Sequence, residues 1–340
     1  MVDKPHNALR FWRGFNLLEM FNVNRQGPWQ EEDFKWIAEW GFNFVRFPMS
    51  YLLWVKEDPF KLDETGMARV DAGIALAQRY GLHVELNFHN APGYCVSREK
   101  DPFGLSLFHD PRSQDAFCFH WQTFARRYRG IPSSQLSFNL VNEPPNHEEH
   151  RVKRSDHDRV MHAAIDAIRA EDPDRLIILD GMSWGNEALP QFAGLANVAQ
   201  SCRAYAPMHL THYKATWVDS SGWPEPDWPK PDDRTDLYDR DRLVNKIYAP
   251  WGELVRQGVG VHCGEGGSHC HTPHRVVLAW LSDVLDILAS YNVGLALWNF
   301  RGPFGVLDSD RADVDYEDFC GHTLDRKLLD LLQSAAPASC

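Results

Sequence analysis

Eight short apolar segments constrain the fold of this chain more than any other feature of its sequence. They are bounded by turn residues and separated mostly by stretches with helical periodicity, and they cover residues 11–18, 42–47, 83–88, 136–141, 176–179, 198–204, 259–263 and 294–299. Apolar runs of this length are typical of buried parallel strands. Eight strands that alternate with helices predict an α/β fold of the (β/α)8 barrel type, also called a TIM barrel.

The segments between the apolar runs carry helical patterns. Residues 31–40 place Phe34, Ile37 and Trp40 on one face and are followed by Gly41, a residue type that commonly ends helices. Further helices are expected over residues 70–80, 115–128, 155–170, 240–256 and 273–291. No internal repeat or linker divides the 340 residues, so we expect residues 1–340 to form a single catalytic barrel domain.

The charge and composition argue against several classes of function. A net charge of -12 disfavours nucleic-acid binding, which draws on clustered Lys and Arg. No apolar run approaches the roughly 20 residues of a membrane span, and the N-terminal part contains no apolar core of signal-peptide length. Seven scattered cysteines fit a reducing compartment better than a disulfide framework. We therefore expect a cytoplasmic protein that binds neither nucleic acid nor membrane, although a trimmed secreted chain would have the same sequence.

Two glutamates stand where apolar segments end. Glu143 follows the fourth segment and lies between Asn142 and Pro144, and Glu265 follows the seventh segment. In a barrel of this type, side chains at the carboxyl ends of the strands form the active site. Two carboxylates at such positions suggest a pair made of a general acid/base and a nucleophile.

The other predicted strand ends carry amide, histidine, arginine, carboxylate and aromatic side chains. This set consists of Asn16, Glu19, Arg46, His89, Asn90, Asn142, Tyr205, His212 and Trp298. The chain has no glycine-rich phosphate loop. Its 13 tryptophans, several of them in the proline-rich segment 217–228, suit a ligand with apolar C–H faces such as a sugar.

Six motifs at these strand ends resemble those of glycoside hydrolase family 5. They are Arg13-Gly-Phe-Asn16, Gly41-Phe-Asn-Phe-Val-Arg-Phe-Pro48, Asn87-Phe-His-Asn-Ala-Pro-Gly93, Asn139-Leu-Val-Asn-Glu-Pro144, Gly264-Glu265-Gly266 and Leu297-Trp298-Asn299, and they follow the family's order over nearly the whole chain. The resemblance implies a retaining hydrolase that uses no cofactor and acts on a β-linked oligosaccharide or polysaccharide. A retaining mechanism requires two carboxyl groups about 5 to 5.5 Å apart, one protonated and one ionised.

The resemblance implies that Glu143 is the general acid/base and that Glu265 is the nucleophile. Arg46, beside Glu265, would keep the nucleophile ionised, because a neighbouring cation favours the charged form. Amides and histidines of the family bond sugar hydroxyls, a tyrosine contacts the nucleophile and a tryptophan forms the floor of a sugar site. The positions predicted to bind substrate in these ways are Arg46, His89, Asn90, Asn142, Tyr205, His212 and Trp298.

Three positions depart from the family pattern. Arg203 stands where many members carry a histidine, Gly266 replaces an aromatic residue, and Asn87 replaces an aspartate. A β-1,4-linked glucan or gluco-oligosaccharide is the first expectation for the substrate, and the alternative is an exo-acting β-glucosidase, β-mannosidase or mannanase of the same family. A non-catalytic carbohydrate-binding barrel is the alternative from a different class, and the presence of both glutamates argues against it.

A local set of histidines and cysteines surrounds Glu265. His262, Cys263 and the run Ser268-His-Cys-His-Thr-Pro-His274 offer zinc ligands, so that a metal-dependent hydrolase is a further hypothesis. No compact Cys-x2-Cys or His-Glu-x-x-His pattern occurs, and the spacing therefore predicts no dedicated metal site. His269 and His271 are instead expected to line the cleft and donate hydrogen bonds to hydroxyls.

Overall fold

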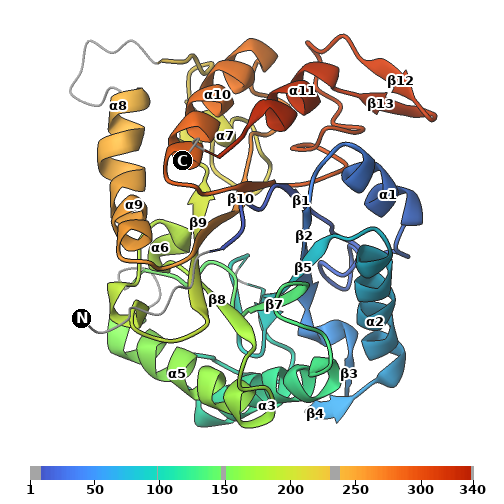
Figure 1. Cartoon of the computed structure of the whole chain (residues 1–340), viewed down its shortest axis with the longest axis vertical. Coiled ribbons are helices and arrows are strands. Elements are labelled where there is room, and N and C mark those ends of the chain that lie inside the picture. The colour runs from blue at the N-terminus through green and yellow to red at the C-terminus, as the bar shows by residue number, and fades with distance from the viewer. Residues whose placement is uncertain (1–8, 98, 147–150, 230–237, 338–340) are drawn as a thin grey trace.

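The computed structural model of the chain describes residues 9–97, 99–146, 151–229 and 238–337. Eight parallel strands form a closed barrel in the order β2-β1-β11-β10-β9-β8-β7-β5, and β5 pairs with β2 to complete the ring (Figure 1). The strands are β1 (Gly14–Asn16), β2 (Phe44–Ser50), β5 (His83–Ala91), β7 (Leu136–Asn139), β8 (Leu176–Asp180), β9 (Val198–Ala204), β10 (Val261–Gly266) and β11 (Leu295–Leu297). Each strand overlaps one of the eight apolar segments, so the predicted (β/α)8 barrel is confirmed.

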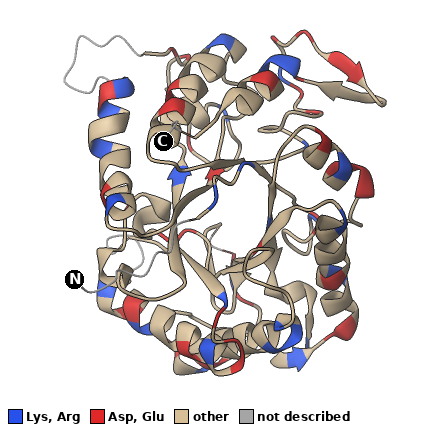
Figure 2. Cartoon of the chain, viewed as in Figure 1, with Lys and Arg blue, Asp and Glu red and all other residues tan. Residues whose placement is uncertain are grey.

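Helices surround the barrel (Figure 1). The longer ones are α1 (Glu31–Glu39), α2 (Glu64–Arg79), α3 (Pro111–Tyr128), α5 (Arg154–Glu171), α9 (Ala249–Arg256), α10 (His274–Ser290) and α11 (Arg326–Ser334). Residues 240–256, predicted as one helix, are divided into α8 (Arg240–Arg242), the π-helical segment η3 (Leu243–Tyr248) and α9. Within the described residues, no helix has both the length and the apolar character needed to cross a bilayer. Figure 2 shows many of the charged residues on these outer helices and only a few on the barrel strands.

Local sequence signals set the ends of several helices. The carboxylate of Asp63 accepts a hydrogen bond from the backbone nitrogen of Thr65 at 3.2 Å and caps the start of α2. Gly41 and Gly81 follow α1 and α2 at φ angles of 82° and 70°. Glycine adopts this left-handed conformation without the steric penalty that other residues incur, which explains why both helices stop where the sequence predicts.

Shorter elements lie in the segments that connect the barrel strands and the longer helices, and none of them was predicted from the sequence. They are η1 (Tyr51–Leu53), β3 (Val55–Lys56), β4 (Asp58–Leu62), β6 (Tyr94–Cys95), α6 (Met182–Gly185), η2 (Pro190–Phe192), α7 (Met208–Thr211), β12 (Glu317–Phe319) and β13 (His322–Leu324). The helix α11 was not predicted either. Its end is tied to the first strand, because the Arg13 guanidinium donates to the carbonyl oxygens of Gln333 and Ala335, both at 2.8 Å.

The barrel interior changes from apolar to polar along the strands. A small apolar cluster near the start of the strands is separate from the main core between strands and helices, and it consists of Trp12, Phe44, Ile178, Ala199 and Ala296. Successive side chains of a strand point to opposite faces, so Arg46 shares the inner face of β2 with Phe44. Charged and amide side chains therefore gather further along, toward the carboxyl ends of the strands.

Candidate active site

The fold brings Glu143 and Glu265 to the same end of the barrel. Glu265 belongs to β10, and Glu143 lies four residues beyond the end of β7. Both carboxylates contact the guanidinium of Arg203 in β9, whose Nε lies 3.0 Å from Glu143 Oε1 and whose Nη2 lies 3.4 Å from Glu265 Oε1. The two side chains that the sequence predicts to be catalytic are therefore joined through one cation.

Arg46 is the second cation of the site and is completely buried. Its Nη1 donates to Glu265 Oε1 at 2.5 Å and to Asn16 Oδ1 at 3.0 Å. Its Nη2 donates to the side-chain oxygens of Asn139 and Asn142, at 2.9 and 2.8 Å. Glu265 is thus bonded to Arg46 inside a network of amides that fixes the guanidinium, and charge-assisted bonds of this kind are stronger than neutral ones.

Arg203 occupies the position at which the chain departs from the family's histidine. Besides the two glutamates, its Nη2 donates to Asn142 Oδ1 at 3.0 Å and to Asp180 Oδ2. Asp180 also accepts from the backbone nitrogen of Glu143 and from Asn139 Nδ2, both at 2.9 Å. The cation that replaces the histidine has its own buried counter-ion, which also fixes the backbone of Glu143.

Asp180 was missed by the sequence reasoning, although it stands at a strand end. It is the last residue of β8, one position beyond the predicted end of the fifth apolar segment. Tyr94 was missed as well. Its hydroxyl donates to the backbone oxygen of Glu143 at 2.5 Å, and Glu143 has a positive φ of 47°. A left-handed residue other than glycine costs free energy, so the bonds from Tyr94 and to Asp180 help to hold Glu143 in this conformation.

The environment raises the pKa of Glu143 to about 8. Burial is the largest cause, and the nearby Glu265 carboxylate adds to it, whereas Arg203 opposes the shift. Tyr205 donates its hydroxyl to Glu265 Oε2 at 3.2 Å. Burial, followed by the charge of Glu265, raises the pKa of the Tyr205 phenol well above its usual range, so the phenol stays a neutral donor. One carboxyl group can therefore hold a proton at neutral pH beside another that is bonded by Arg46 and Tyr205.

Asn142 and His89 present unpartnered polar atoms. The oxygen of Asn142 accepts from both guanidinium groups, while its Nδ2 is buried without a hydrogen-bond partner. His89 Nδ1 is also buried and unpartnered, and burial, together with Arg46, lowers the pKa of the ring so that it stays neutral. Buried polar groups normally find partners, so these two atoms are unsatisfied within the described residues.

Trp298 directly follows β11 and is half-buried. Its ring stacks on His89, with centroids 5.6 Å apart and planes at 19°, and Phe21 packs against both rings. Asn90 follows His89 in β5, where it pairs with Ser50 of β2 and Cys95 of β6. The predicted sugar floor is thus supported by an aromatic group that includes the predicted hydroxyl-binding histidine.

His212 lies beside the network and makes no described bond to either glutamate. Its ring packs edge-on against Tyr205 with centroids 5.1 Å apart, and its Nδ1 lies 2.9 Å from Thr211 Oγ1. Burial lowers the pKa of His212 to about 4, so it is a neutral neighbour of Tyr205. Trp217, from the proline-rich segment, packs against His212 at 6.1 Å and is 59% exposed, so its outer face is open to a ligand.

A further buried carboxylate lies beneath the site. Glu85 of β5 has no solvent exposure, and its Oε1 lies 3.2 Å from Arg46 Nε without hydrogen-bond alignment. His262 of β10 approaches its other oxygen at 4.0 Å. Burial raises the pKa of Glu85 to about 7, against the effect of Arg46. No sequence signal marks Glu85, because it lies inside an apolar strand instead of at its end.

Two cavities adjoin the network. One of about 280 Å³ is lined by Asn16, which accepts from Arg46, and also by Glu19 and Asn299. Burial raises the pKa of Glu19 to about 7. The other, of about 520 Å³, is lined by Tyr94, which donates to the backbone of Glu143. The first cavity is therefore connected to the network through Arg46 and the second through the backbone of Glu143, and neither glutamate is among the lining residues.

The sequence of this chain is similar to those of known glycoside hydrolases. The family model "Cellulase (glycosyl hydrolase family 5)" matches residues 3–302. The chain is 26% identical to Endoglucanase C of Acetivibrio thermocellus over 312 residues, which cover 84% of this chain and 88% of that protein. It is 30% identical to Cellodextrinase A of Ruminococcus flavefaciens over 194 residues, covering 56% of this chain and 55% of that one.

Two solved structures share the fold. A glycoside hydrolase superposes with a TM-score of 0.89 at 39% identity, over 95% of this chain and 99% of the other. Cel5A of Thermotoga maritima, solved in complex with mannotriose, superposes with a TM-score of 0.77 at 24% identity, over 97% of this chain and 100% of the other.

Proposed function

The chain belongs to glycosyl hydrolase family 5 and is a glycoside hydrolase, and on that premise we propose that it cleaves β-1,4-linked glucans and gluco-oligosaccharides with retention of configuration. We assign Glu143 as the general acid/base and Glu265 as the nucleophile. The observation that carries this assignment is the pair of carboxyl groups, Glu265 buried and Glu143 half-buried, that share Arg203 and differ in their other partners.

The two carboxyl groups act in two steps. Glu265 attacks the anomeric carbon while the protonated Glu143 gives its proton to the leaving glycosidic oxygen, which forms a covalent glycosyl-enzyme. Glu143, now ionised, takes a proton from water as the water attacks the same carbon and releases Glu265. The raised pKa of Glu143 suits the first step, because the group is protonated before the substrate reacts.

The charges around the nucleophile support this order. Arg46 and Tyr205 both donate to the Glu265 carboxylate, and these bonds favour its ionised form before attack. In the covalent intermediate one oxygen of Glu265 becomes an ester oxygen. We infer that Tyr205 keeps its hydrogen bond to the Glu265 group in the intermediate. Arg46 keeps its hydrogen bonds to its amide partners.

Sugar recognition is assigned to the unpartnered donors and the aromatic surface. The free Nδ2 of Asn142 points from an amide already fixed by both guanidinium groups, so it suits the 2-hydroxyl, whose hydrogen bond strengthens in the transition state. We assign His89 and Asn90 to other hydroxyls of the same ring and Trp298 to its apolar face. His212 is assigned an indirect part, in which it positions Tyr205.

The preference for glucans rests on the relatives, among which are an endoglucanase and a cellodextrinase. Mannan-directed and exo-acting alternatives use the same catalytic residues. A panel of cellohexaose, mannohexaose and aryl β-glycosides, with product lengths measured over time, distinguishes them: internal cleavage of cellohexaose is expected, and release of single glucose units or faster cleavage of mannohexaose would contradict the proposal.

The role of Glu265 has a chemical test. Glu265→Ala is expected to abolish turnover of cellohexaose, and added azide should restore cleavage of an activated aryl glycoside with an inverted glycosyl azide as product. Glu225→Ala, which removes an exposed carboxylate from the loop after β9, is the matched control and should keep wild-type activity. Full activity in Glu265→Ala would refute the assignment.

A further inference from the structure

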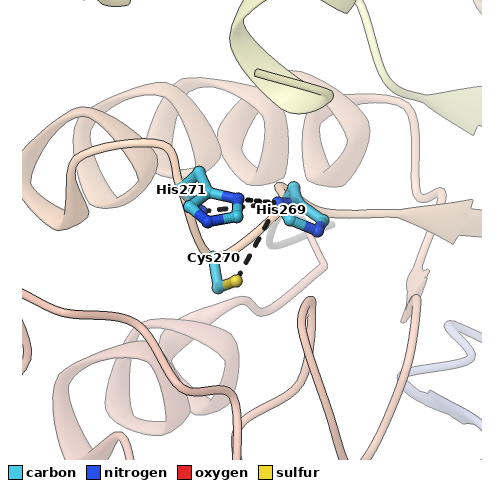
Figure 3. A group of neighbouring side chains, drawn as sticks. All are labelled: His269, Cys270 and His271. Atoms are coloured by element: carbon cyan, nitrogen blue, oxygen red, sulfur yellow. Dashed lines mark hydrogen bonds between the residues drawn. The ribbon is translucent and has the colours of Figure 1, made fainter. Parts of the chain in front are cut away.

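Three consecutive side chains converge just beyond β10, at His269, Cys270 and His271 (Figure 3). The Nδ1 atoms of the two histidines lie 3.1 Å apart, and Cys270 Sγ lies 3.9 Å from His269 Nδ1. The three potential ligand atoms all lie within 4.8 Å of one another. We propose that this turn, residues 269–271, binds one divalent transition-metal ion of the zinc type, outside the carboxylate network.

The distances suit such an ion. In a tetrahedral zinc site, bonds of about 2.0–2.1 Å to nitrogen and about 2.3 Å to sulfur separate two nitrogen ligands by about 3.3 Å and nitrogen from sulfur by about 3.6 Å. The separations of His269 from His271 and from Cys270 differ from these values by only a few tenths of an ångström, and the third pair lies within 4.8 Å. Two imidazoles and a thiolate select zinc, cobalt or nickel over magnesium and calcium, which prefer oxygen ligands. His271 is exposed, which leaves a fourth position open to water.

The protonation states also suit a metal. Two Nδ1 atoms at 3.1 Å can share one proton, but they cannot both carry one without repulsion. On binding, the shared proton moves to a distal ring nitrogen, and both Nδ1 lone pairs face the ion.

The cysteine must lose its proton to act as a ligand. Burial raises the pKa of the Cys270 thiol, and Arg311 partly offsets this effect. Binding therefore releases one proton from Cys270 to solvent, and the metal affinity should fall as the pH is lowered. The resulting thiolate also offsets the repulsion between the ion and the Arg311 guanidinium.

The backbone that presents the three ligands is fixed before any ion arrives. Arg311 donates to the carbonyl oxygens of Ser268 and His269, at 3.0 and 3.2 Å, and to that of Thr272. The backbone nitrogen of His269 donates to the carbonyl oxygen of Thr211 at 2.8 Å. A turn whose backbone is held at both ends loses little conformational entropy when its side chains bind a ligand.

The turn adjoins the cleft without being part of the chemistry. The ring of His269 packs against Trp217 at 5.4 Å and against Phe304 at 5.6 Å. Phe304 in turn contacts Tyr205 at 6.3 Å. A bound ion would immobilise this aromatic wall, so metal binding is expected to alter sugar affinity while the carboxylates remain untouched.

Cobalt(II) is the probe for the test, because its absorption spectrum reports both tetrahedral geometry and thiolate ligation. Titration of the full-length, metal-free protein is expected to show one equivalent of Co²⁺ bound, with visible bands of a tetrahedral ion and a near-ultraviolet band from sulfur. Zinc should then displace the cobalt and bleach both bands. Cys270→Ser should lose the sulfur band, and His271→Ala should weaken binding at least about tenfold, the scale seen when metal-site residues are changed.

The variants are chosen so that the fold survives. His271 is exposed and Cys270 is half-buried, whereas the deeply buried His269 is left in place. Cys320→Ser, which removes an exposed thiol elsewhere, is the matched control and should bind like the wild type. Absence of a stoichiometric cobalt spectrum in the wild type, or an unchanged sulfur band in Cys270→Ser, would overturn the proposal. Either result would leave the catalytic assignment of Glu143 and Glu265 unaffected.

Discussion

Glu143 and Glu85 are two carboxyl groups of the same barrel with raised pKa values, and they differ in their exposure to solvent. Burial raises the pKa of both, to about 8 and about 7, and each lies next to one of the two buried guanidinium groups. The side chain of Glu143 keeps 14% of its exposure, whereas that of Glu85 has none. Glu143 therefore faces the cleft, and Glu85 is sealed beneath it.

The comparison teaches that a perturbed pKa does not by itself identify a catalytic group. Arg46 serves several carboxylates, of which Glu265 accepts a well-aligned hydrogen bond and Glu85 does not. Glu85 is positioned to balance the charge of Arg46 from below. Access to substrate, in addition to burial and charge, separates the proposed acid/base from the supporting carboxylate.

The largest expected effect is a loss of activity when Glu143 is replaced, which replacement of Glu85 should not cause. Glu143→Ala should lower kcat on cellohexaose by about 10² to 10⁴, the usual contribution of general acid–base catalysis. The loss in kcat/KM should be much smaller for a dinitrophenyl glycoside, whose leaving group needs no proton. Glu85→Gln is the matched change and should stay within a few-fold of wild type near pH 6, where Glu85 is already largely protonated. Equal losses in both variants would erase the proposed distinction.

The next effect concerns pH. Glu143 must be protonated to act as an acid, and its pKa is raised to about 8, so kcat/KM should be retained below that pH and fall about tenfold per unit above it. The measurement is a pH profile of kcat/KM on cellohexaose. The same profile for Glu143→Ala on the dinitrophenyl substrate should lack this basic limb. A limb that persists in the variant would mean that another group, such as Glu85, controls it.

The smallest expected effect is the change in the pH profile when Asp180, which lies near both Glu143 and Glu85, loses its charge. Asp180 raises the pKa of both Glu143 and Glu85 by its charge, so Asp180→Asn should move the basic limb of the profile to lower pH. The shift should be under about one pH unit, equivalent to less than tenfold in activity on the limb. Thermal unfolding of the variant provides the control for structural damage. A limb that moves to higher pH would contradict the described electrostatics.

Much of the fold was predictable because barrel strands are short apolar runs with clear ends. All eight strands appear where the sequence predicts them, although β1 and β11 are shorter than their apolar segments. An apolar run predicts that a segment is buried, but hydrogen bonding to the neighbouring strands decides at which residue the strand begins and ends. Helix α11 was missed because the sequence reasoning ended with the eighth strand, and the bonds from Arg13 that hold it come from the other end of the chain.

The site was predictable to the extent that strand ends mark it. Glu143, Glu265, Arg46 and Asn142 meet there because parallel strands in a barrel direct their carboxyl ends to one rim. Glu85 was not predictable in this way, since inward-facing residues inside a strand carry no end signal.

The sequence offers residues 268–274 as possible zinc ligands, but its spacing rules predict no dedicated site at the turn for which we propose metal binding. Those rules look for ligands at regular separations, whereas His269 to His271 are consecutive residues brought together by a turn. Only the conformation shows that neighbouring side chains point to the same place. His262 and Cys263, which the sequence groups with them, belong to β10 and are buried, His262 near Glu85 inside the barrel and Cys263 in the core between strands and helices.

The link from Arg13 to the end of α11 has a consequence for how the chain acquires its structure. Strand β1 pairs with β2 and β11, and the residue just before it bonds carbonyls more than 300 positions away. Contacts of such long sequence separation slow folding, because the intervening chain must be ordered first. On the ribosome, the proposed nucleophile can meet Arg46 only after the seventh strand has emerged, 219 positions after Arg46 itself.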